Sequence, residues 1–480
     1  MEFHILSSPL LIEMIQRLDA GLARRSENRA YWAGKQPLAY LAPEARQALG
    51  NRFGVLSVNF PRVAIAALTE RLRLNGFQGV DVWPDLLECD YDQLAHTLHR
   101  EALLQGESYA LVWADESGNP TVTIESGESV AVKRNPVNPS IVMAAIKRVR
   151  VKTTPSQTGY TDIWIYTPES VQHWRSNAPG GSGEFVLQAE NPNPLGVVPV
   201  VPFTNSDLLP SAWSEALYLE YSGESEIQPL KNLVDGLNKT VADLAVAQEF
   251  TARPRRWATG IEAAESPVID EEGNPVLDDD GEPLTTEVNP IPEGSRAMLA
   301  ADPQARFGQL DGANLAGFRT AVDIWIQAIM AVTALPAHMC GITTANPSTA
   351  DAIRAAEAGL TSRAEAKAAQ FGRSHEQVAR LVYAICNKES PSTVNVRALW
   401  GPFDQRSEAA SADAAVKLYS SGLLSRTATL QRLGFTADEI ADELDHIERD
   451  AQLGHDITMG RYIRDAVRPN SIEPKQRDGV

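Results

Sequence analysis

Two amphipathic segments that enclose a strongly acidic insert are the feature that most constrains the fold of this chain. In residues 314–335, apolar residues recur three and four positions apart, a spacing typical of a helix that packs against other helices. In the segment before the insert, Leu230, Leu237 and Leu244 recur every seven residues. Both segments therefore predict helices with an apolar stripe. The stripe of the second helix consists of Leu315, Phe318, Val322, Trp325, Ile329 and Val332.

The insert between these helices is too acidic to form a core. Residues 262–293 hold eleven Asp or Glu and no Lys or Arg, so we expect the insert to project from the helices and to be available to a partner. It contains two tandem octads, residues 268–275 and 276–283, and each carries the pattern Asp-x-x-Gly-x-Pro. The same pattern begins at Asp115. Because Asp bonds to the following backbone and Gly adopts positive φ, the pattern predicts tight turns.

Calcium binding is the alternative interpretation of the two octads. An EF-hand loop requires Asp-x-Asp-x-Asp-Gly spacing, and neither octad has it. The composition therefore favours solvated hairpin turns.

Length, charge and cysteine content set the outer limits. A chain of 480 residues can hold two to four domains. A formal net charge of −19 argues against a free-standing nucleic-acid binder, which usually has a basic surface. Three widely spaced cysteines (Cys89, Cys340 and Cys386) form no disulfide framework and favour a reducing compartment. The sequence predicts no membrane span and no secretion signal.

The pattern along the chain predicts an α+β protein. Helices are expected at 7–30, 59–74 and 92–105, and the stretch 108–203 alternates as strands do. After Pro336 we expect a loop of small residues over 337–348. The strands are expected at 109–113, 121–124, 130–132, 141–151 and 163–166.

The last third of the sequence is predicted to be mainly helical. A capping box at Ser348 begins a long Ala-rich helix that reaches about Asn387, with a kink near Gly372 and a new cap at Ser374. A short strand ends at Trp400. A further capping box at Thr436 marks another helix.

The sequence patterns for catalytic and metal-binding residues are weak. No P-loop is present, and Gly106-Glu-Ser108-Tyr-Ala110 has helix and strand in the wrong order for a nucleophile elbow. His96 and His99 can share a helix face, but no third ligand follows at a metal-binding spacing. His338 and Cys340 are a lone pair in a loop. We expect no catalytic residue, no metal and no cofactor, and a Ser108-dependent hydrolase is the alternative of another class.

Several short motifs occur in an order that resembles a known family. They include Gly106–Val112, Leu195–Phe203, Arg253-Pro254-x-Arg256-Trp257, Glu357-Ala-Gly-Leu360 and Gly422-Leu-Leu-Ser425. Each is weak by itself, but their order over most of the chain is specific. The chain resembles a tailed-bacteriophage portal protein of the type related to the portal of phage SPP1, as found in many actinobacterial phages.

The resemblance implies a portal fold with a mixed α/β wing, a two-helix stem, a small β-containing clip, a long kinked helix and a helical C-terminal crown. The implied boundaries are the wing at 1–210, stem helices at 211–252 and 309–335, the clip at 253–308, the tunnel loop at 336–350, the long wing helix with its return strand at 351–400, and the crown at 401–480.

The resemblance also implies a function and partners. About twelve copies would form a ring at one capsid vertex, through which terminase packages double-stranded DNA without reading its sequence. Expected partners are the terminase large subunit, head–tail connector or adaptor proteins, and major capsid and scaffolding proteins. The protein would be assembled in the bacterial host cytoplasm and reside in the virion. Another phage head connector is the alternative function.

The implied roles can be assigned to residues. Thr343, Thr344 and Asn346 would face DNA from the tunnel loop. Leu315, Phe318, Val322, Trp325 and Ile329 would pack the stem. The clip acids that would dock a partner are Asp270, Glu271, Glu272, Asp278, Asp279 and Asp280.

Overall fold

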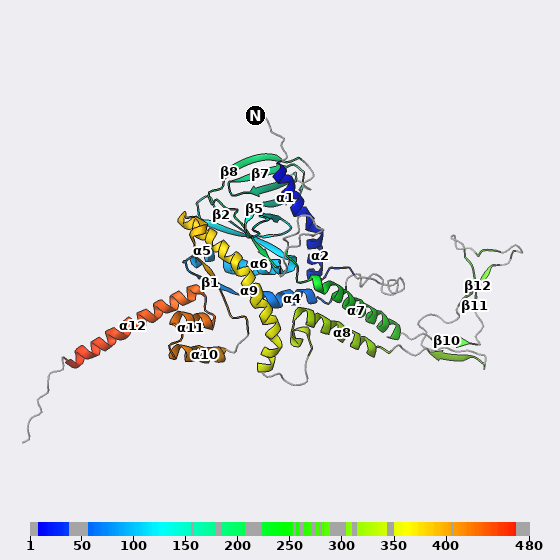
Figure 1. Ribbon diagram of the computed structural model, residues 1–480. Coiled ribbons are helices and arrows are strands. Elements are labelled where there is room, and N and C mark those ends of the chain that lie inside the picture. Colours follow the sequence, from blue (N-terminus) through cyan, green and yellow to red (C-terminus); the bar gives the residue numbers. More distant parts are fainter. Residues whose placement is uncertain are drawn as a thin grey trace, which may run out of the picture. The chain divides into compact units, whose positions relative to one another are not determined.

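The chain, seen here in a computed structural model, divides into two compact units (Figure 1). One unit comprises residues 1–37, 57–234 and 326–480, and the other comprises residues 38–56 and 235–325. The structure describes residues 8–37, 56–154, 158–178, 184–206, 223–252, 256–259, 264–269, 275–277, 281, 283–288, 304–309, 314–342, 350–404 and 408–466.

Two helices open the larger unit where the sequence predicted one. α1 spans Pro9–Ala20 and α2 spans Leu22–Ala33, and they are separated at Gly21. A Cβ on Gly21 would lie 2.4 Å from Nη1 of Arg25, so the guanidinium occupies the space beside this residue. The expectation of a single helix over 7–30 is therefore wrong at Gly21.

The next helices follow the sequence pattern more closely. α4 spans Phe60–Thr69, and its N-cap Asn59 accepts a hydrogen bond from the Arg62 amide at 3.3 Å. It ends before the predicted position 74, because Leu74–Gln78 forms strand β1. After the short helix α5 (Trp83–Glu88), α6 spans Tyr91–Gln105 and confirms the predicted helix.

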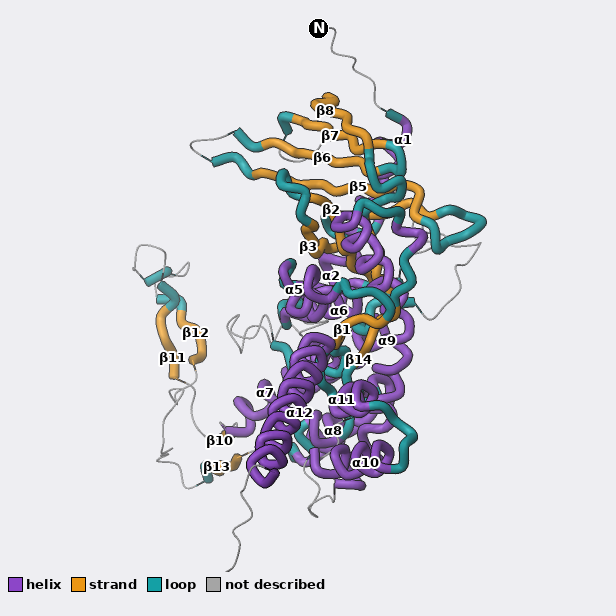
Figure 2. The backbone as a smooth tube through the Cα atoms, turned by 90° about the vertical axis from the view of Figure 1, so that its left-hand side faces the viewer, coloured by secondary structure: helices purple, strands orange, loops and turns teal. Residues whose placement is uncertain are grey.

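Two antiparallel sheets follow (Figure 2). The larger has the strand order β4-β5-β6-β7-β8, and the smaller has the order β3-β2-β9. The sequence predicted β2 to β6 but did not identify β7, β8 or β9. The strands are β2 (Glu107–Ala114), β3 (Pro120–Ser126), β4 (Val130–Arg134), β5 (Val142–Val151), β6 (Tyr160–Tyr166), β7 (Ser170–Ser176), β8 (Val186–Pro192) and β9 (Val200–Thr204).

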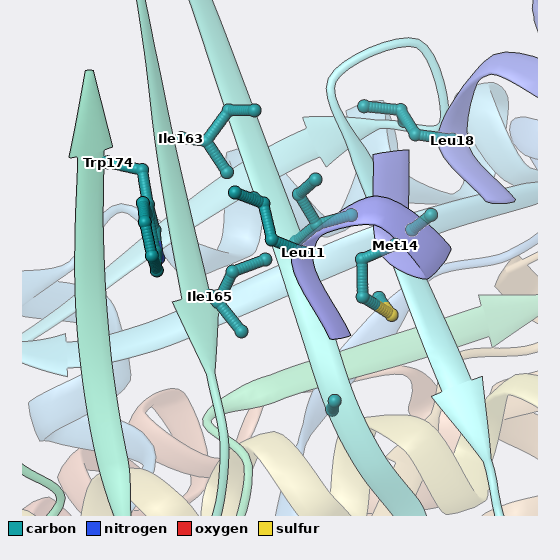
Figure 3. Packing of buried hydrophobic residues seen from close by; sticks show 9 residues of the cluster. Leu11, Met14, Leu18, Ile163, Ile165 and Trp174 are labelled. Atoms are coloured by element: carbon teal, nitrogen blue, oxygen red, sulfur yellow. The ribbon is translucent and has the colours of Figure 1, made fainter. Parts of the chain in front are cut away.

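The five-stranded sheet is covered on both faces by apolar residues. Leu11, Met14 and Leu18 of α1 pack on one face (Figure 3). Side chains of the smaller sheet, including Tyr109 and Val200, pack with residues of the other face. Fully burying one such side chain contributes about 1.5–3 kcal/mol. The sheet residues beneath α1 are Ala131, Ala144, Ile146, Ile163, Ile165 and Trp174.

The turn between β2 and β3 has the predicted chemistry. Oδ1 of Asp115 accepts hydrogen bonds from the amides of Ser117 and Asn119, both at 2.8 Å. Gly118 has φ 89, a conformation that glycine adopts without steric cost. The Asp-x-x-Gly-x-Pro turn is confirmed at this position.

Two backbone segments cross at a pair of glycines. A Cβ on Gly223 would lie 1.9 Å from the Gly106 carbonyl oxygen, and a Cβ on Gly106 would lie 2.3 Å from the Gly223 carbonyl oxygen. The Asn205 amide donates to the same Gly106 oxygen at 2.7 Å, and Ser225 Oγ donates to the Leu104 carbonyl. The chain is therefore tied to the end of α6 just before it enters the next helix.

A long helix, α9, spans Ala350–Asn387 without interruption. Its 38 residues give a length of about 57 Å. The expected new cap at Ser374 is wrong, because Ser374 Oγ donates to the Pro202 carbonyl at 2.8 Å and the helix continues. Strand β14 (Arg397–Trp400) follows and pairs antiparallel with β1, which confirms the strand predicted to end at Trp400.

The C-terminal part is helical, as predicted. The helices are α10 (Glu408–Ser420), α11 (Arg426–Leu433) and α12 (Ala437–Ala466). The Thr436 amide donates to Glu439 Oε2 at 2.8 Å, which confirms the predicted capping box. Trp83 Nε1 also donates to Asp438 Oδ1 at 2.9 Å, so the start of α12 is held against α5.

The two predicted helices that enclose the acidic insert are present. α7 spans Lys231–Ala252 and follows the short helix η1 (Gln228–Leu230), and α8 spans Ala316–Thr333. The expected positions 211–222 lie outside the described residues. Between the helices, β10 (Arg256–Thr259) pairs with β13 (Arg306–Gln309), and β11 (Ala264–Pro267) pairs with β12 (Thr285–Val288), both antiparallel.

Candidate functional site

The apolar stripe of α8 packs against α7 through a tryptophan. The ring of Trp325 lies on Gly236, where a Cβ would come within 2.7 Å of the ring. Trp325 Nε1 also donates to Thr240 Oγ1 at 3.1 Å. Glycine thus provides the space that lets the ring approach the helix backbone.

Burial along the stripe is incomplete in a single chain. Ile329 is fully buried. The other predicted packing residues, Leu315, Phe318, Val322 and Trp325, are half-buried. Each of them therefore keeps apolar surface that a neighbouring copy can cover.

The two acidic octads are described only at their ends. The carboxylates predicted to dock a partner, residues 270–272 and 278–280, lie outside the described residues. Ile269 forms an antiparallel bridge with Pro275, and Leu277 forms one with Pro283. The described ends of each octad therefore pair with each other, as the ends of a hairpin do.

Apolar residues within and next to the octads are exposed, which the sequence analysis did not predict. Ile269 is 60% exposed, Leu277 57% and Leu284 47%. At the base of the insert, Trp257 and Phe307 are also exposed. Exposed apolar side chains among carboxylates form a surface that a protein partner can bind. A search for apolar residues flanking each turn would have found the three aliphatic positions.

The predicted tunnel-loop residues Thr343, Thr344 and Asn346 lie outside the described residues. The segments on both sides of them are described and joined. Arg363 Nη1 of α9 donates to the Val332 carbonyl of α8 at 2.7 Å.

A buried carboxylate makes a second connection near the same loop. Glu357 of α9 is buried and accepts a hydrogen bond from Arg71 Nη2 at 3.1 Å. Its other oxygen lies 3.3 Å from Nε2 of His338, in the short helix η2 (Ala337–Cys340). The end of α8 and the helix η2, which precede the segment 343–349, are therefore both bonded to α9, which follows it.

A buried histidine pair is the main polar cluster that sequence reasoning missed. His99 Nε2 of α6 lies 2.7 Å from Nε2 of His375 of α9, and Nδ1 of His375 lies 2.9 Å from the Tyr91 hydroxyl. Phe203, Phe371 and Trp400 surround the two rings.

The charge state of this pair follows from its surroundings. Burial lowers the pKa of His99 to about 3 and holds the pKa of His375 well below its usual value, because a charged imidazole is poorly solvated there. Both rings are therefore neutral near pH 7.

The positions of the candidate enzymatic residues do not support catalysis or metal binding. Ser108 is fully buried, and its Oγ donates to the Leu98 carbonyl at 2.8 Å, so it is not presented as a nucleophile. His99 bonds to His375 and does not share a metal site with His96. No group of three or more His, Cys, Asp or Glu in the described part of the chain is arranged to hold a metal ion.

Among the helices that the structure describes, none is long and apolar enough to cross a bilayer.

Comparison with known proteins identifies the family. The family model described as "Phage portal protein, SPP1 Gp6-like" matches residues 74–453. The portal protein of Mycobacterium phage D29 is 26% identical over 469 residues, covering 94% of this chain and 90% of that protein. The portal protein of Mycobacterium phage L5 is 25% identical over 487 residues, covering 96% and 93%.

Similar solved structures include chains of gene transfer agent particles. One is the neck of a native particle computed with C12 symmetry, at 13% identity and a TM-score of 0.42, covering 85% of this chain and 99% of that chain. Another is the neck of an empty particle computed with C6 symmetry, at 14% identity and a TM-score of 0.43, with the same coverage.

Proposed function

The chain belongs to the SPP1 Gp6-like family of phage portal proteins, and from this membership we propose that it forms a ring-shaped channel for double-stranded DNA at one capsid vertex. The match over residues 74–453 is the observation that carries the proposal. About twelve copies would close the ring through repeated contacts of the same two surfaces. The ring would be a virion component, assembled in the host cytoplasm.

The parts of the chain take the roles that the family resemblance implies. The sheets and α9 form the wing, α7 and α8 the stem, and α10 to α12 the crown. The half-buried stripe of α8 supports the stem assignment, because a packed ring covers apolar surface that one copy leaves exposed. The proposed boundaries are 1–210, 211–252, 253–308, 309–335, 336–350, 351–400 and 401–480.

The insert over 253–308 is proposed as the clip, where terminase and later the connector or adaptor proteins dock. Exposed apolar residues such as Ile269 and Leu277, placed next to the carboxylates of each octad, support this role. Capsid and scaffolding proteins would contact other parts of the ring.

The charge of the chain is consistent with a channel that DNA passes without binding tightly. Twelve copies at −19 carry about −230 formal charges. Such an excess repels phosphate and avoids the counterion-release affinity that would hold DNA in place.

Electron microscopy of the purified protein tests the proposal directly. A ring with a central hole of duplex width is expected. Another phage head connector, the second candidate, would lack either the ring or a stem of two helices per copy. A field of monomers or of closed shells would overturn the portal assignment for this chain.

We expect Trp325→Ala to prevent assembly of the ring. If the assembled stem buries the indole, the substitution costs about 3–5 kcal/mol there, because it leaves a cavity over Gly236 and removes the bond to Thr240. The oligomeric state by light scattering and the melting temperature are the measurements. The control is Gln327→Ala on the same helix, where the side chain is polar and exposed. Normal rings with unchanged melting in Trp325→Ala would contradict the stem assignment.

Deleting the second octad, residues 276–283, is expected to leave the ring intact and to weaken docking of terminase or connector. The described residues of this octad are exposed, so its loss removes little buried surface. Pull-down of each partner with parent and deleted protein gives the comparison. Unchanged binding of both partners would show that the octad does not contribute to docking.

The proposed tunnel loop has its own test. Replacing Thr343 and Thr344 with Lys would place about twenty-four positive charges around the channel of a twelve-membered ring, and each phosphate contact adds close to one unit to the salt slope of DNA binding. We expect normal rings, salt-sensitive retention of DNA and slower packaging in vitro. A packaging rate and salt dependence equal to those of the parent would show that these residues do not line the channel.

A further inference from the structure

Three arginines gather around one buried carboxylate on the C-terminal half of α9. The side chain of Glu376 is only 7% exposed, and its Oε2 lies 3.3 Å from Nη1 of Arg373 and 3.6 Å from Nη2 of Arg380. Nη1 of Arg397, on β14, lies 3.4 Å from the same oxygen. These four side chains are the basic cluster.

The basic cluster carries more positive charge than its own carboxylate can balance. Within the described part of the chain, Glu376 is the one carboxylate within ion-pair distance of the three guanidinium groups, which leaves a local charge of +2. Arg373 is 68% exposed and Arg397 56% exposed, so this excess lies at the surface. Guanidinium groups in such a position bind carboxylate or phosphate groups.

Helix α5 lies on another side of α9. The thiol of Cys386, near the C-terminal end of α9, lies next to the carboxylate of Asp85 on α5, and the two helices pack against each other (Figure 1). At 3.6 residues per turn, Cys386 stands about 120–140° around the helix axis from Arg373 and Arg380. The basic cluster and α5 are therefore on different sides of α9.

Four carboxylates of α5 and the start of α6 form an acidic surface without a basic partner. Burial raises the pKa of Cys89, and so do the nearby carboxylates of Glu88, Asp85 and Asp90. Asp92 follows in the first turn of α6. No Lys, Arg or His of the described residues lies within ion-pair distance of these four acids. They are the acidic surface.

A ring of like-charged copies needs two surfaces of this kind. At a formal charge of −19 each, whole copies repel one another, and closure of a ring needs local compensation where they touch. A cyclic ring with one repeated contact uses two different surfaces of every copy. The basic cluster and the acidic surface meet both requirements, because the first in one copy can face the second in the next.

We propose that the basic cluster of each copy binds the acidic surface of α5 and α6 in a second copy of this chain, its neighbour in the ring. The proposal rests on the proposed channel function, which requires the ring. Glu376 would hold the guanidinium groups in place, and the exposed Arg373 and Arg397 would reach the neighbour's carboxylates. Duplex DNA would leave the acidic surface unpaired, whereas a second copy pairs both surfaces.

Charge reversal on each surface tests the proposal. One variant combines Arg373→Glu with Arg397→Glu and keeps Arg380, and the other combines Glu88→Arg with Asp92→Arg. All four replaced side chains are exposed, so both variants should melt close to the parent. At low salt, each variant alone should need at least about a tenfold higher concentration than the parent to form rings, measured by light scattering and electron microscopy.

An equal mixture of the two variants separates contact between copies from a folding defect. Where the variants alternate around a ring, every interface joins two parent surfaces or two reversed surfaces, so opposite charges face each other at each contact. The mixture should therefore form rings at the concentration that the parent needs. The matched control, Arg150→Glu with Lys152→Glu at the exposed end of β5, changes the net charge as much as the first variant and should assemble like the parent.

Several results would overturn the proposal. Parent-like assembly of both double variants would show that the two surfaces do not meet, and an equal loss in the control would show a general effect of charge. A mixture that stays unassembled would exclude the acidic surface as the partner. Parent-like rings of the Arg373→Glu, Arg397→Glu variant with weakened binding of a labelled DNA duplex would make the partner a nucleic acid. Only the absence of rings in the parent would overturn the portal assignment as well.

Discussion

Replacing Arg25 with Ala is expected to lower the free energy of unfolding by about 3–5 kcal/mol, because it leaves Glu107 buried without its partner. The two side chains form an ion pair between α2 and β2 and are only 1% and 7% exposed. A Cβ on Gly127 would lie 2.6 Å from Nε of Arg25, so the space around the guanidinium is closed and water has little room to replace it. Urea unfolding at neutral pH measures the difference.

Two controls separate the unpaired charge from a general loss of packing. Arg29→Ala, one turn further along α2, removes an arginine that is 43% exposed, and we expect at most about 1 kcal/mol. Arg25→Met with Glu107→Leu removes both charges and should recover much of the loss. If the double variant is as unstable as Arg25→Ala, the cost lies in packing and our explanation is wrong.

Acidification is expected to destabilise the folded chain through the His99–His375 pair. The pKa of an unfolded histidine is about 6.5, whereas burial lowers the pKa of His99 to about 3 and that of His375 well below its usual value. Below pH 6.5 the unfolded chain therefore binds more protons than the folded chain. The free energy of unfolding should fall by about 1.4 kcal/mol per pH unit for each histidine, and for His99 this continues down to about pH 3.

In variants without the two imidazoles, the free energy of unfolding should fall less steeply as the pH is lowered. We expect His99→Gln with His375→Gln to be less stable at pH 7, because the bond to Tyr91 changes, but to lose up to about 2.7 kcal/mol less per pH unit between pH 6.5 and 4.5. His96→Gln is the control on the same helix, since His96 is exposed. If the free energy of unfolding falls equally steeply with pH in the parent and the double variant, the histidine pair does not cause the loss of stability in acid.

Local chemistry accounts for the elements that the sequence predicted well. α6 has a regular apolar face, and Asp115 with Gly118 forms its turn from contacts within five residues. The capping box at Thr436 is equally local. Such features depend on neighbours along the chain, and a sequence pattern contains those neighbours.

Long-range packing accounts for the elements that it did not predict. β1 pairs with β14 across more than three hundred residues, so Leu74 continues into a strand and not into the helix before it. At Gly21, where α1 and α2 are separated, the neighbouring space is filled by the Arg25 guanidinium, which pairs with the distant Glu107. Ser374 faces the Pro202 carbonyl, and for that reason it does not cap a helix.

In the candidate site, too, local features were predicted from the sequence and long-range contacts were not. The periodic spacing of apolar residues predicted the stripe of α8. It did not predict that Trp325 packs on Gly236, because a glycine within a helix has no recognisable sequence pattern. The His99–His375 pair joins residues 276 positions apart, and nothing in the spacing of either histidine indicates the other.

The crossing of Gly106 and Gly223 has a consequence for how this chain can vary. Each residue excludes a Cβ through the backbone oxygen of the other, so no side-chain change elsewhere can compensate for a substitution at either one. In a library that randomises both codons and selects for folded protein, we therefore expect glycine alone at both positions. The two codons would show no covariation despite their contact, since neither tolerates a first mutation to which the other could adapt. Short glycine motifs of this kind can thus remain recognisable between chains whose surrounding residues have diverged.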